Sequence, residues 1–170
     1  MNIVSKLKNH FHYDPESGDI FRKKKWRDQP AMTKVGSKTC NGRYLSSSMG
    51  SVYYRAHIIA WALMTDQLPE NEIDHINGDG CDNRWVNLRQ ATRQQNNINQ
   101  TIRKDNTSGF KGVVKQSRSK TWKVQLNVDG KRCSKTGFTS KEQAAHAYDL
   151  WAVDVYGSFA KLNYRRPYSG

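Results

Sequence analysis

The stretch IDHINGDGCDNRWVNLR, residues 73–89, decides how the first half of the chain is organised. An apolar residue, Ile73, precedes an Asp-His pair, and Leu88 restores apolar character after a run rich in Asp, Asn and Gly. Glycines in such a run give the backbone freedom to turn. The pattern predicts a short strand that carries Asp74 and His75, followed by a long polar loop that leads back to the core.

A helix is expected directly after this loop. Thr92 and Gln95 match a capping box, in which the Thr hydroxyl and the Gln side chain each satisfy a free donor at the start of a helix, so we expect a helix from about 91 to 100. Asn96 and Asn97 lie inside this helix although Asn is a mediocre helix former, which asks for a functional reason. Strand, loop and helix would then bring a carboxylate, an imidazole and amides into one small volume.

These side chains together suit phosphodiester hydrolysis. Asp and Asn oxygens are hard ligands that suit magnesium or manganese. An imidazole can act as a general base near neutral pH, while a metal ion neutralises the scissile phosphate and the leaving oxygen. Local chemistry alone leaves an alternative open, in which an Asx-rich loop merely holds its own turns.

The remainder of the first half predicts small strands around one helix. Residues 13–21, YDPESGDIF, contain a turn signal and predict a hairpin, and residues 43–57 alternate around a central Gly and predict two strands. Residues 56–64, AHIIAWALM, have apolar residues at helical spacing and predict a buried helix that is broken before Pro69. The basic run 22–27 is either a solvated charge run or a strip that binds the DNA backbone.

The second half predicts three strands followed by a helix. The strands are expected at 110–116, 121–128 and 131–138, with a strong hairpin turn at Asp129-Gly130. A second capping box, Thr139 with Glu142, opens a helix over 140–156, and Gly157 stands where a left-handed C-terminal cap belongs.

The charge of the chain favours a nucleic-acid partner. The 170 residues carry a formal net charge of +13, and the isoelectric point near 9.8 lies in the range typical of nucleic-acid-binding domains. Residues 1–101 hold 14 Lys and Arg against 10 Asp and Glu, whereas residues 102–170 hold 14 against 5. The alternative is a generic basic surface.

Composition also argues against several classes of protein. No apolar run approaches the roughly 20 residues needed to span a bilayer, and the N-terminus lacks the apolar core of a signal peptide, so we expect an intracellular protein without a membrane partner. The cysteines Cys40, Cys81 and Cys133 are odd in number and far apart, which disfavours a zinc site and disulfides. We expect no small-molecule cofactor.

Residues 55–99 resemble the HNH endonuclease motif, also called the ββα-metal or His-Me finger, in the version found in phage homing endonucleases. The resemblance rests on Asp74-His75, Asn87-Leu88-Arg89, Thr92 and Asn96 at the family's spacing. It implies that His75 is the general base, that Asp74 and Asn96 bind one divalent ion, magnesium or manganese, and that Asn87 holds His75 in its working orientation. Many relatives carry His where this chain has Asn96.

The same resemblance implies a finger that sits across the minor groove of double-stranded DNA and cuts one strand per active site. A monomer would then nick DNA, and a dimer, the alternative, would break both strands. A phage enzyme of this kind would act in the cytoplasm of the bacterial host.

Several neighbours of the motif have two interpretations. His57 is either structural or a phosphate contact, and Asn97 is the rival of Asn96 for the metal. The acidic residues Asp79 and Asp82 either shape the loop or bind metal, and the basic residues Arg89 and Arg93 either contact phosphates or are solvated.

Residues 109–164 resemble the DNA-binding domain of plant ethylene-response factors, the APETALA type. The residues that carry this resemblance are Ser108 to Val113, Trp122, Gly137-Phe138, Ala144 to Asp149 and Gly157 to Tyr164. That family reads the major groove with its three-stranded sheet, which implies a DNA-binding role here. The matching or nearby candidates for DNA contact are Lys111, Arg132, Lys115, Arg118, Lys123, Gln125 and Lys135. These side chains either read bases or only neutralise phosphates, and Val114 and Ser134 depart from the plant pattern.

The expected fold is therefore α+β: an N-terminal ββα-metal HNH nuclease domain joined to a small three-stranded antiparallel sheet plus one helix. The expected boundaries are 1–101 with a core finger at 55–100, a linker at 102–108, a DNA-binding domain at 109–164 and a tail at 165–170. The leading hypothesis is a metal-dependent DNA endonuclease of the homing type. The alternatives are a catalytically inactive, sequence-specific DNA-binding regulator and a non-specific nucleic-acid protein.

Overall fold

The fold mixes helices with small antiparallel sheets, which confirms the α+β prediction. The computed structural model describes residues 2–25, 27–39, 42–102, 105–117 and 119–164. The chain divides into two compact units, residues 1–96 and 97–170. The predicted tail at 165–170 and part of the predicted linker lie outside the described residues.

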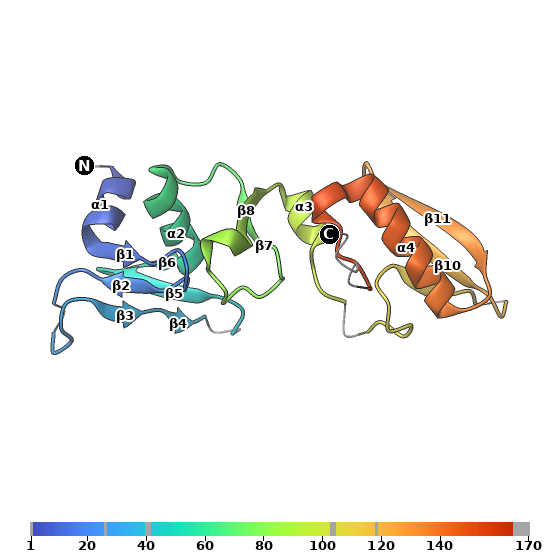
Figure 1. The fold of residues 1–170 in the computed structure, drawn as a ribbon, viewed down its shortest axis with the longest axis horizontal. Helices are drawn as coiled ribbons and strands as arrows, with labels where there is room; N and C mark the ends of the chain where they lie inside the picture. The colour runs from blue at the N-terminus through green and yellow to red at the C-terminus, as the bar shows by residue number, and fades with distance from the viewer. Residues whose placement is uncertain (1, 26, 40–41, 103–104, 118, 165–170) are drawn as a thin grey trace. The chain divides into compact units, whose positions relative to one another are not determined.

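The first unit is built from short elements (Figure 1). They are α1 (Ile3–His10), β1 (Phe11–Tyr13), β2 (Ile20–Arg22), β3 (Thr33–Val35), β4 (Ser37–Lys38), β5 (Leu45–Met49), β6 (Val52–Arg55), α2 (Ala56–Thr65), β7 (Glu72–His75), the 3-10 turn η1 (Trp85–Asn87) and β8 (Leu88–Ala91), after which α3 (Arg93–Ile98) begins. The strands form three sheets with the orders β1–β2–β3, β4–β5–β6 and β7–β8. The predicted hairpin at 13–21 and the predicted strand pair within 43–57 are confirmed as β1–β2 and β5–β6.

The core of the first unit gathers around α2. This helix is almost entirely apolar, and it buries five of its ten residues, with Ile59 and Ala60 at 0 % exposure. It packs on α1 and on the strands β1, β5 and β6, and Figure 1 shows the two helices side by side over the strands. The helix ends at Asp66, which adopts a left-handed conformation with φ +62°.

The strand pair that follows positions the predicted site. Strands β7 and β8 pair antiparallel, with Asp74 opposite Arg89 and His75 opposite Leu88. The capping box that opens α3 is confirmed, since the Thr92 N–H donates to Gln95 Oε1 at 2.8 Å and the Gln95 N–H donates to Thr92 Oγ1 at 3.3 Å. The helix is shorter than predicted, because β8 continues through Ala91 and α3 ends at Ile98.

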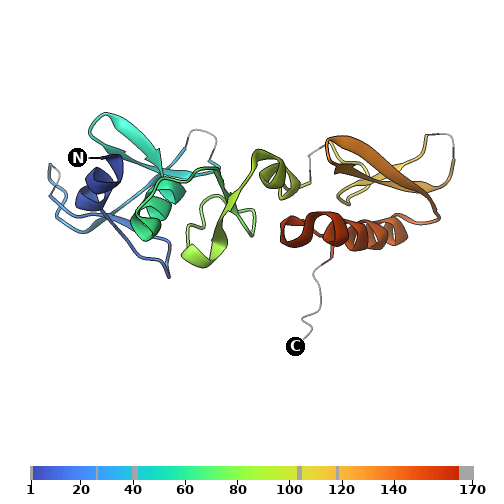
Figure 2. The ribbon, with the colours of Figure 1, turned by 90° about the horizontal axis from the view of Figure 1, so that it is seen from above.

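The second unit is a three-stranded antiparallel sheet covered by one helix. Its elements are β9 (Val113–Lys115), β10 (Trp122–Val128), β11 (Lys131–Phe138), α4 (Lys141–Tyr156) and the 3-10 turn η2 (Gly157–Phe159), and the sheet order is β11–β10–β9. Helix α4 lies along one face of this sheet (Figure 2). The predicted order of three strands and a helix is therefore confirmed.

Two local predictions about α4 were wrong in detail. The helix is capped by Ser140, whose Oγ accepts from the Gln143 N–H at 3.1 Å, rather than by Thr139 with Glu142. Gln143 Oε1 instead accepts from the N–H of Thr139 at 3.1 Å. Gly157 has a positive φ of +55° as expected, but its ψ of −129° lies outside the left-handed helical region.

Candidate active site

Asp74 and His75 are buried although both are polar. Asp74 is 3 % exposed and His75 is 5 % exposed, and they end β7 directly after Ile73. Buried polar groups of this kind require partners, because an unpaired buried charge costs several kcal/mol. The contacts of these two side chains therefore define the site.

The carboxylate of Asp74 pairs with a guanidinium across the strand pair. Arg89 donates from Nε at 2.9 Å and from an Nη at 2.8 Å to the same oxygen, Oδ2 of Asp74. The side chains of Arg89 and Asp74 are 18 % and 4 % exposed. Arg89 was expected either to contact phosphate or to be solvated. In this structure its guanidinium instead forms an ion pair with Asp74.

The imidazole of His75 lies among an amide and two aromatic rings. Its Nε2 is 3.2 Å from Oδ1 of Asn83, and its ring centroid is 5.1 Å from that of His57 and 6.0 Å from that of Tyr44. Burial lowers the pKa of His75 below its ordinary value, against the opposing effect of the Asn83 hydrogen bond. The imidazole is therefore neutral near pH 7, which is the state that a general base needs.

His57, on α2, meets His75 edge-on and is itself 4 % exposed. Its buried Nδ1 has no hydrogen-bond partner among the residues that the structure describes. Burial, assisted by the nearby His75 and Arg55, lowers the pKa of His57 to about 3. A neutral, buried ring of this kind favours the structural interpretation of His57 over a phosphate contact.

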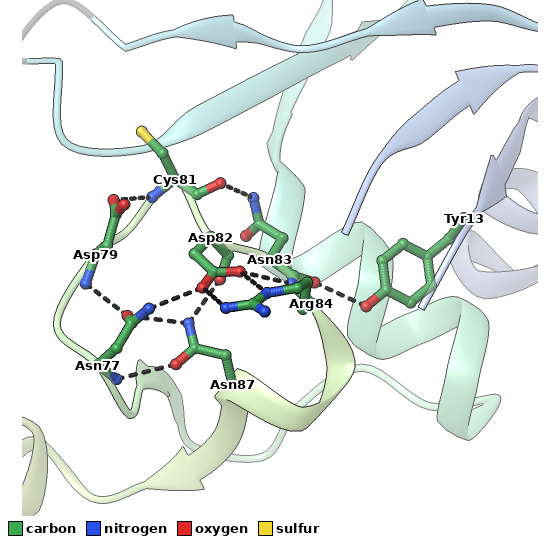
Figure 3. A network of polar contacts seen from close by, with 8 residues as sticks. All are labelled: Tyr13, Asn77, Asp79, Cys81, Asp82, Asn83, Arg84 and Asn87. Carbon is green, nitrogen blue, oxygen red and sulfur yellow. Dashed lines mark hydrogen bonds and ion pairs between the residues drawn. The ribbon is translucent and has the colours of Figure 1, made fainter. Parts of the chain in front are cut away.

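A network of side-chain hydrogen bonds holds the loop between β7 and β8 (Figure 3). Asn87 lies at its centre: Oδ1 accepts from the Asn77 N–H at 2.9 Å, and Nδ2 donates to Asn77 Oδ1 at 3.1 Å and to the Asp82 carbonyl at 2.7 Å. Asp79 accepts from the N–H of Cys81, and Asp82 accepts from Asn77 and Arg84. The Arg84 guanidinium lowers the pKa of Asp82 to about 2. These contacts support loop-shaping roles for both acids.

Asn87 was predicted to hold His75 in its working orientation, but in the structure two amides, those of Asn87 and Asn83, support the histidine and its loop. The hydrogen bonds of Asn87 described above pin the loop, and its backbone carbonyl accepts from the N–H of Ile76, next to His75. The amide that meets His75 Nε2 belongs to Asn83. The sequence analysis did not single out Asn83, because a contact across eight residues of an irregular loop leaves no periodic signal.

The two predicted metal ligands lie on neighbouring elements, β7 and α3. Asn96 donates from Nδ2 to Oε2 of Glu72 at 2.6 Å. Glu72 stands two residues before Asp74 in β7, so the two carboxylates share one side of the strand. Among the described residues no three His, Cys, Asp or Glu side chains cluster closely enough to hold a metal. The oxygen donors present nevertheless suit a hard divalent ion that takes its remaining ligands from water and phosphate.

The other candidates on α3 are more exposed. Arg93 lies on the surface at the first position of the helix, where it can reach solvent or a phosphate. Asn97, the rival metal ligand, is also exposed, and its Oδ1 accepts from Nε2 of Gln100 at 2.8 Å.

Comparison with known proteins places this site in a family. The sequence model of a family described as HNH endonuclease matches residues 54–98. Protein 3.8 of Escherichia phage T7 is 30 % identical over 109 residues, which cover 64 % of this chain and 89 % of that protein. The chain carries an HNH endonuclease domain at residues 54–98. The match at 54–98 lies mostly in the first unit, which ends at Asn96, and does not start at the N-terminus as the predicted domain 1–101 does.

A second relative is a viral protein that carries the family in its name. The uncharacterized HNH endonuclease L560 of Acanthamoeba polyphaga mimivirus is 36 % identical over 91 residues, which cover 54 % of this chain. The match spans 46 % of that protein, less than half of its length. No solved structure matches the chain.

The DNA-contact candidates outside the finger fall on two faces of the second sheet. Val124 and Leu126 are buried under α4, so Lys123 and Gln125 point away from the helix. Arg132 pairs with Asn127 and shares that outer face. The outer face of the sheet is therefore formed in part by Lys123, Gln125 and Arg132.

Three further candidates lie elsewhere, and one is not described. Lys135 stands opposite Val124, and its Nζ is 4.5 Å from the ring centroid of Trp151 on α4, so it faces the helix. Lys115 pairs with Trp122, also on the helix side. Lys111 donates from Nζ to the carbonyls of Ile98 and Gln100. Arg118 lies outside the described residues.

The structure also bears on what the composition predicted about membrane spans and cysteines. None of the helices within the described ranges is long and apolar enough to cross a membrane. Cys81 and Cys133 are free thiols, and Cys40 lies outside the described residues.

Proposed function

We propose that this HNH endonuclease is a metal-dependent enzyme of the homing type that hydrolyses a phosphodiester bond in double-stranded DNA. Acting as a monomer, it would nick one strand per active site. The observation that carries the proposal is the neutral, buried His75 directly beside the carboxylate of Asp74, at the end of a strand within the HNH match.

His75 is the general base of the proposed reaction. A neutral imidazole accepts a proton from the water that attacks the phosphorus, and burial keeps the ring neutral near pH 7. The loop network around Asn87 keeps the end of β7 in place while this occurs. The general base and the loop network around Asn87 both lie within the HNH match.

Asp74 and Asn96 would hold one divalent ion, magnesium or manganese. A bound ion supplies positive charge for the scissile phosphate and for the leaving oxygen. Magnesium is usually bound by one or two protein carboxylates together with waters and substrate phosphates, so a two-residue protein contribution is sufficient. Asn96 donates to Glu72 from its Nδ2, so the hydrogen bond to that carboxylate does not use the amide oxygen of Asn96.

The second unit would bind DNA through the outer face of its sheet, in the manner of APETALA-type domains. The excess positive charge of residues 102–170 supports this role, and so does the cluster of Lys123, Gln125 and Arg132 on a sheet face that α4 leaves open. Phosphate contacts would supply much of the affinity, so binding should weaken steeply as salt rises.

Cleavage of supercoiled plasmids tests the proposal. Plasmids carrying candidate phage or host DNA are incubated with magnesium or manganese, beside EDTA and His75→Ala controls. We expect nicked circles that need both the metal and His75, with a rate for His75→Ala that is roughly 10²–10⁴-fold lower. Identical products from wild type and His75→Ala, or DNA binding without cleavage by either, would instead indicate a DNA-binding protein with an inactive finger.

A further inference from the structure

Asn83 is the most deeply buried polar residue of the loop, at 1 % exposure. Both ends of its amide are engaged: Oδ1 meets Nε2 of His75 at 3.2 Å, and Nδ2 donates to the carbonyl of Cys81 at 3.2 Å. The bond to Cys81 decides the orientation of the amide, because a carbonyl accepts only from the NH₂ end. The group that faces His75 is therefore an acceptor.

The backbone of Asn83 is held by a segment that lies outside the HNH match. The hydroxyl of Tyr13 donates to the Asn83 carbonyl at 2.7 Å, in a buried hydrogen bond across 70 residues of sequence. Tyr13 ends β1, and Figure 3 shows it reaching the loop from the side of the N-terminal strands. The family match begins only at residue 54.

Two further contacts tie the same N-terminal segment to the loop. The Trp85 N–H donates to the Pro15 carbonyl at 2.9 Å. At Gly18, which has φ +78°, a Cβ atom would lie 2.5 Å from the backbone nitrogen of Arg84 and 2.6 Å from the carbonyl carbon of Asn83. The β1–β2 turn therefore presses directly on the backbone at 83–85, and only a glycine allows so close an approach.

We propose that Asn83 is a positioning residue for His75, that it holds the imidazole in the Nε2–H tautomer, and that the β1–β2 hairpin clamps Asn83 in place. The inference rests on the proposed function of His75 as general base. An amide oxygen can only accept, so the neutral ring must carry its proton on Nε2, and the lone pair that takes the proton from water resides on Nδ1. The N-terminal hairpin is then a working part of the nuclease site.

Nuclear magnetic resonance of the full chain tests the tautomer without metal or DNA. Long-range ¹H–¹⁵N correlations of a protein labelled with ¹⁵N-histidine distinguish the protonated from the unprotonated ring nitrogen. We expect a single His75 tautomer with the proton on Nε2 at pH 7.5. Asn83→Leu, which keeps the size of the side chain and removes the acceptor, should give a mixture of tautomers, whereas Asn83→Asp, which keeps the acceptor, should retain the wild-type tautomer.

Cleavage rates under saturating DNA give a second readout. Asn83→Leu should lower the single-turnover rate by roughly 10–100-fold, the effect typical of groups that orient a catalytic histidine, with little change in the DNA concentration needed for half-maximal rate. Tyr13→Phe, which removes one hydroxyl, should lower the rate several-fold. The matched control is Tyr53→Phe, since the Tyr53 ring is 76 % exposed on β6 and should show the wild-type rate.

The outcomes separate this inference from the proposed function. A wild-type His75 with its proton on Nδ1, or an unchanged tautomer in folded Asn83→Leu, overturns the positioning role whatever the cleavage assay gives. The expected tautomer shift in a protein that cuts no DNA would retain the positioning role and reject the nuclease. If Asn83→Leu fails to fold, Tyr13→Phe decides, because a wild-type tautomer and rate in that variant would reject the clamp.

Discussion

The two strand pairs β7–β8 and β10–β11 are both antiparallel, yet their connections differ greatly. Strands β10 and β11 are joined by Asp129 and Gly130 alone, both with positive φ as a tight hairpin requires. Strands β7 and β8 are joined by residues 76–87. Pairing two strands therefore does not need the longer connection.

The polar residues of the longer connection form hydrogen bonds with one another and with His75. Asn77, Asp79, Asp82, Asn83 and Asn87 all use their side chains in hydrogen bonds within the loop or to the imidazole. Fixing each of these residues costs conformational entropy, which a two-residue turn largely avoids. The contrast indicates that the length of the β7–β8 loop serves the site around His75. Substitutions in the two strand pairs test this, from the largest expected effect to the smallest.

Removing the cross-strand cation of β7–β8 should have the largest effect. Arg89→Met leaves the buried carboxylate of Asp74 without its guanidinium, and the free energy of unfolding should fall by about 3–5 kcal/mol, as is usual when one member of a buried ion pair is removed. Urea unfolding of the full chain, with the two units fitted as separate transitions, measures the loss.

The matched control for this variant lies on the other strand pair. Arg132 of β11 faces Asn127 across the ladder and is exposed, so Arg132→Met should change the free energy of unfolding by less than about 0.5 kcal/mol. Equal losses in the two variants would remove the contrast between a ladder that carries a site and one that does not.

Breaking the loop network should have the next largest effect. Asn87→Ala removes three hydrogen bonds from a residue that is 6 % exposed, and should cost about 2–3 kcal/mol because each buried bond contributes about 1 kcal/mol. Thermal unfolding measures the loss, and faster hydrogen exchange at the Asn77 amide should accompany it. Asn127→Ala, an exposed position in β10, is the control, and exchange at Asn77 that stays slow in Asn87→Ala would show that other contacts hold the loop.

The sequence predicted the elements that depend on neighbouring residues. The Thr92–Gln95 capping box, the Asp129–Gly130 turn and the buried helix over 56–64 each follow from side chains a few positions apart. The capping of α4 shows the limit of this reasoning. Ser140 with Gln143 and Thr139 with Glu142 are overlapping matches to the same pattern, and only the start of the helix selects between them.

The site depended on contacts that the sequence does not encode locally. Asp74 and His75 could be singled out from the motif, but the pairing of Asp74 with Arg89 follows from the register of β7 and β8. The approach of Tyr13 to Asn83 spans 70 residues and depends on the packing of the N-terminal hairpin. The orientation of Lys135 likewise follows from a pairing between strands, because Lys135 stands opposite Val124, whose side chain is buried, and its Nζ lies over the Trp151 ring of α4.

The buried histidines His57 and His75 should make the first unit sensitive to mild acid. The pKa of His57 is about 3 when folded against 6.5 when unfolded, so the unfolded chain binds a proton that the folded chain refuses. Stability is therefore fully present above pH 6.5 and is lost progressively as pH falls towards 3. Between pH 7.5 and pH 5 this group alone should lower the free energy of unfolding by about 2 kcal/mol.

Urea unfolding at a series of pH values checks this sign and size. The lowered pKa of His75 acts in the same direction and adds to the loss. His57→Leu should flatten the profile of the first transition, while the second unit, whose His146 is exposed, should show no matching change on this substitution. A profile for His57→Leu as steep as that of the wild type would place the acid sensitivity elsewhere.

The smallest effect on stability should come from a matched pair of glycines, one in each connection. Gly78 has φ +82° and Gly130 has φ +78°, so an Ala at either position costs about 1 kcal/mol of backbone strain. The Gly78 N–H donates to the His75 carbonyl at 2.8 Å, whereas Gly130 lies in a turn that serves only the β10–β11 pair. Gly78→Ala and Gly130→Ala should therefore lose similar stability in urea, yet only Gly78→Ala should slow plasmid nicking under saturating DNA. Equal nicking rates for the two variants would mean that the loop tolerates strain beside His75, and that its length serves something other than the site.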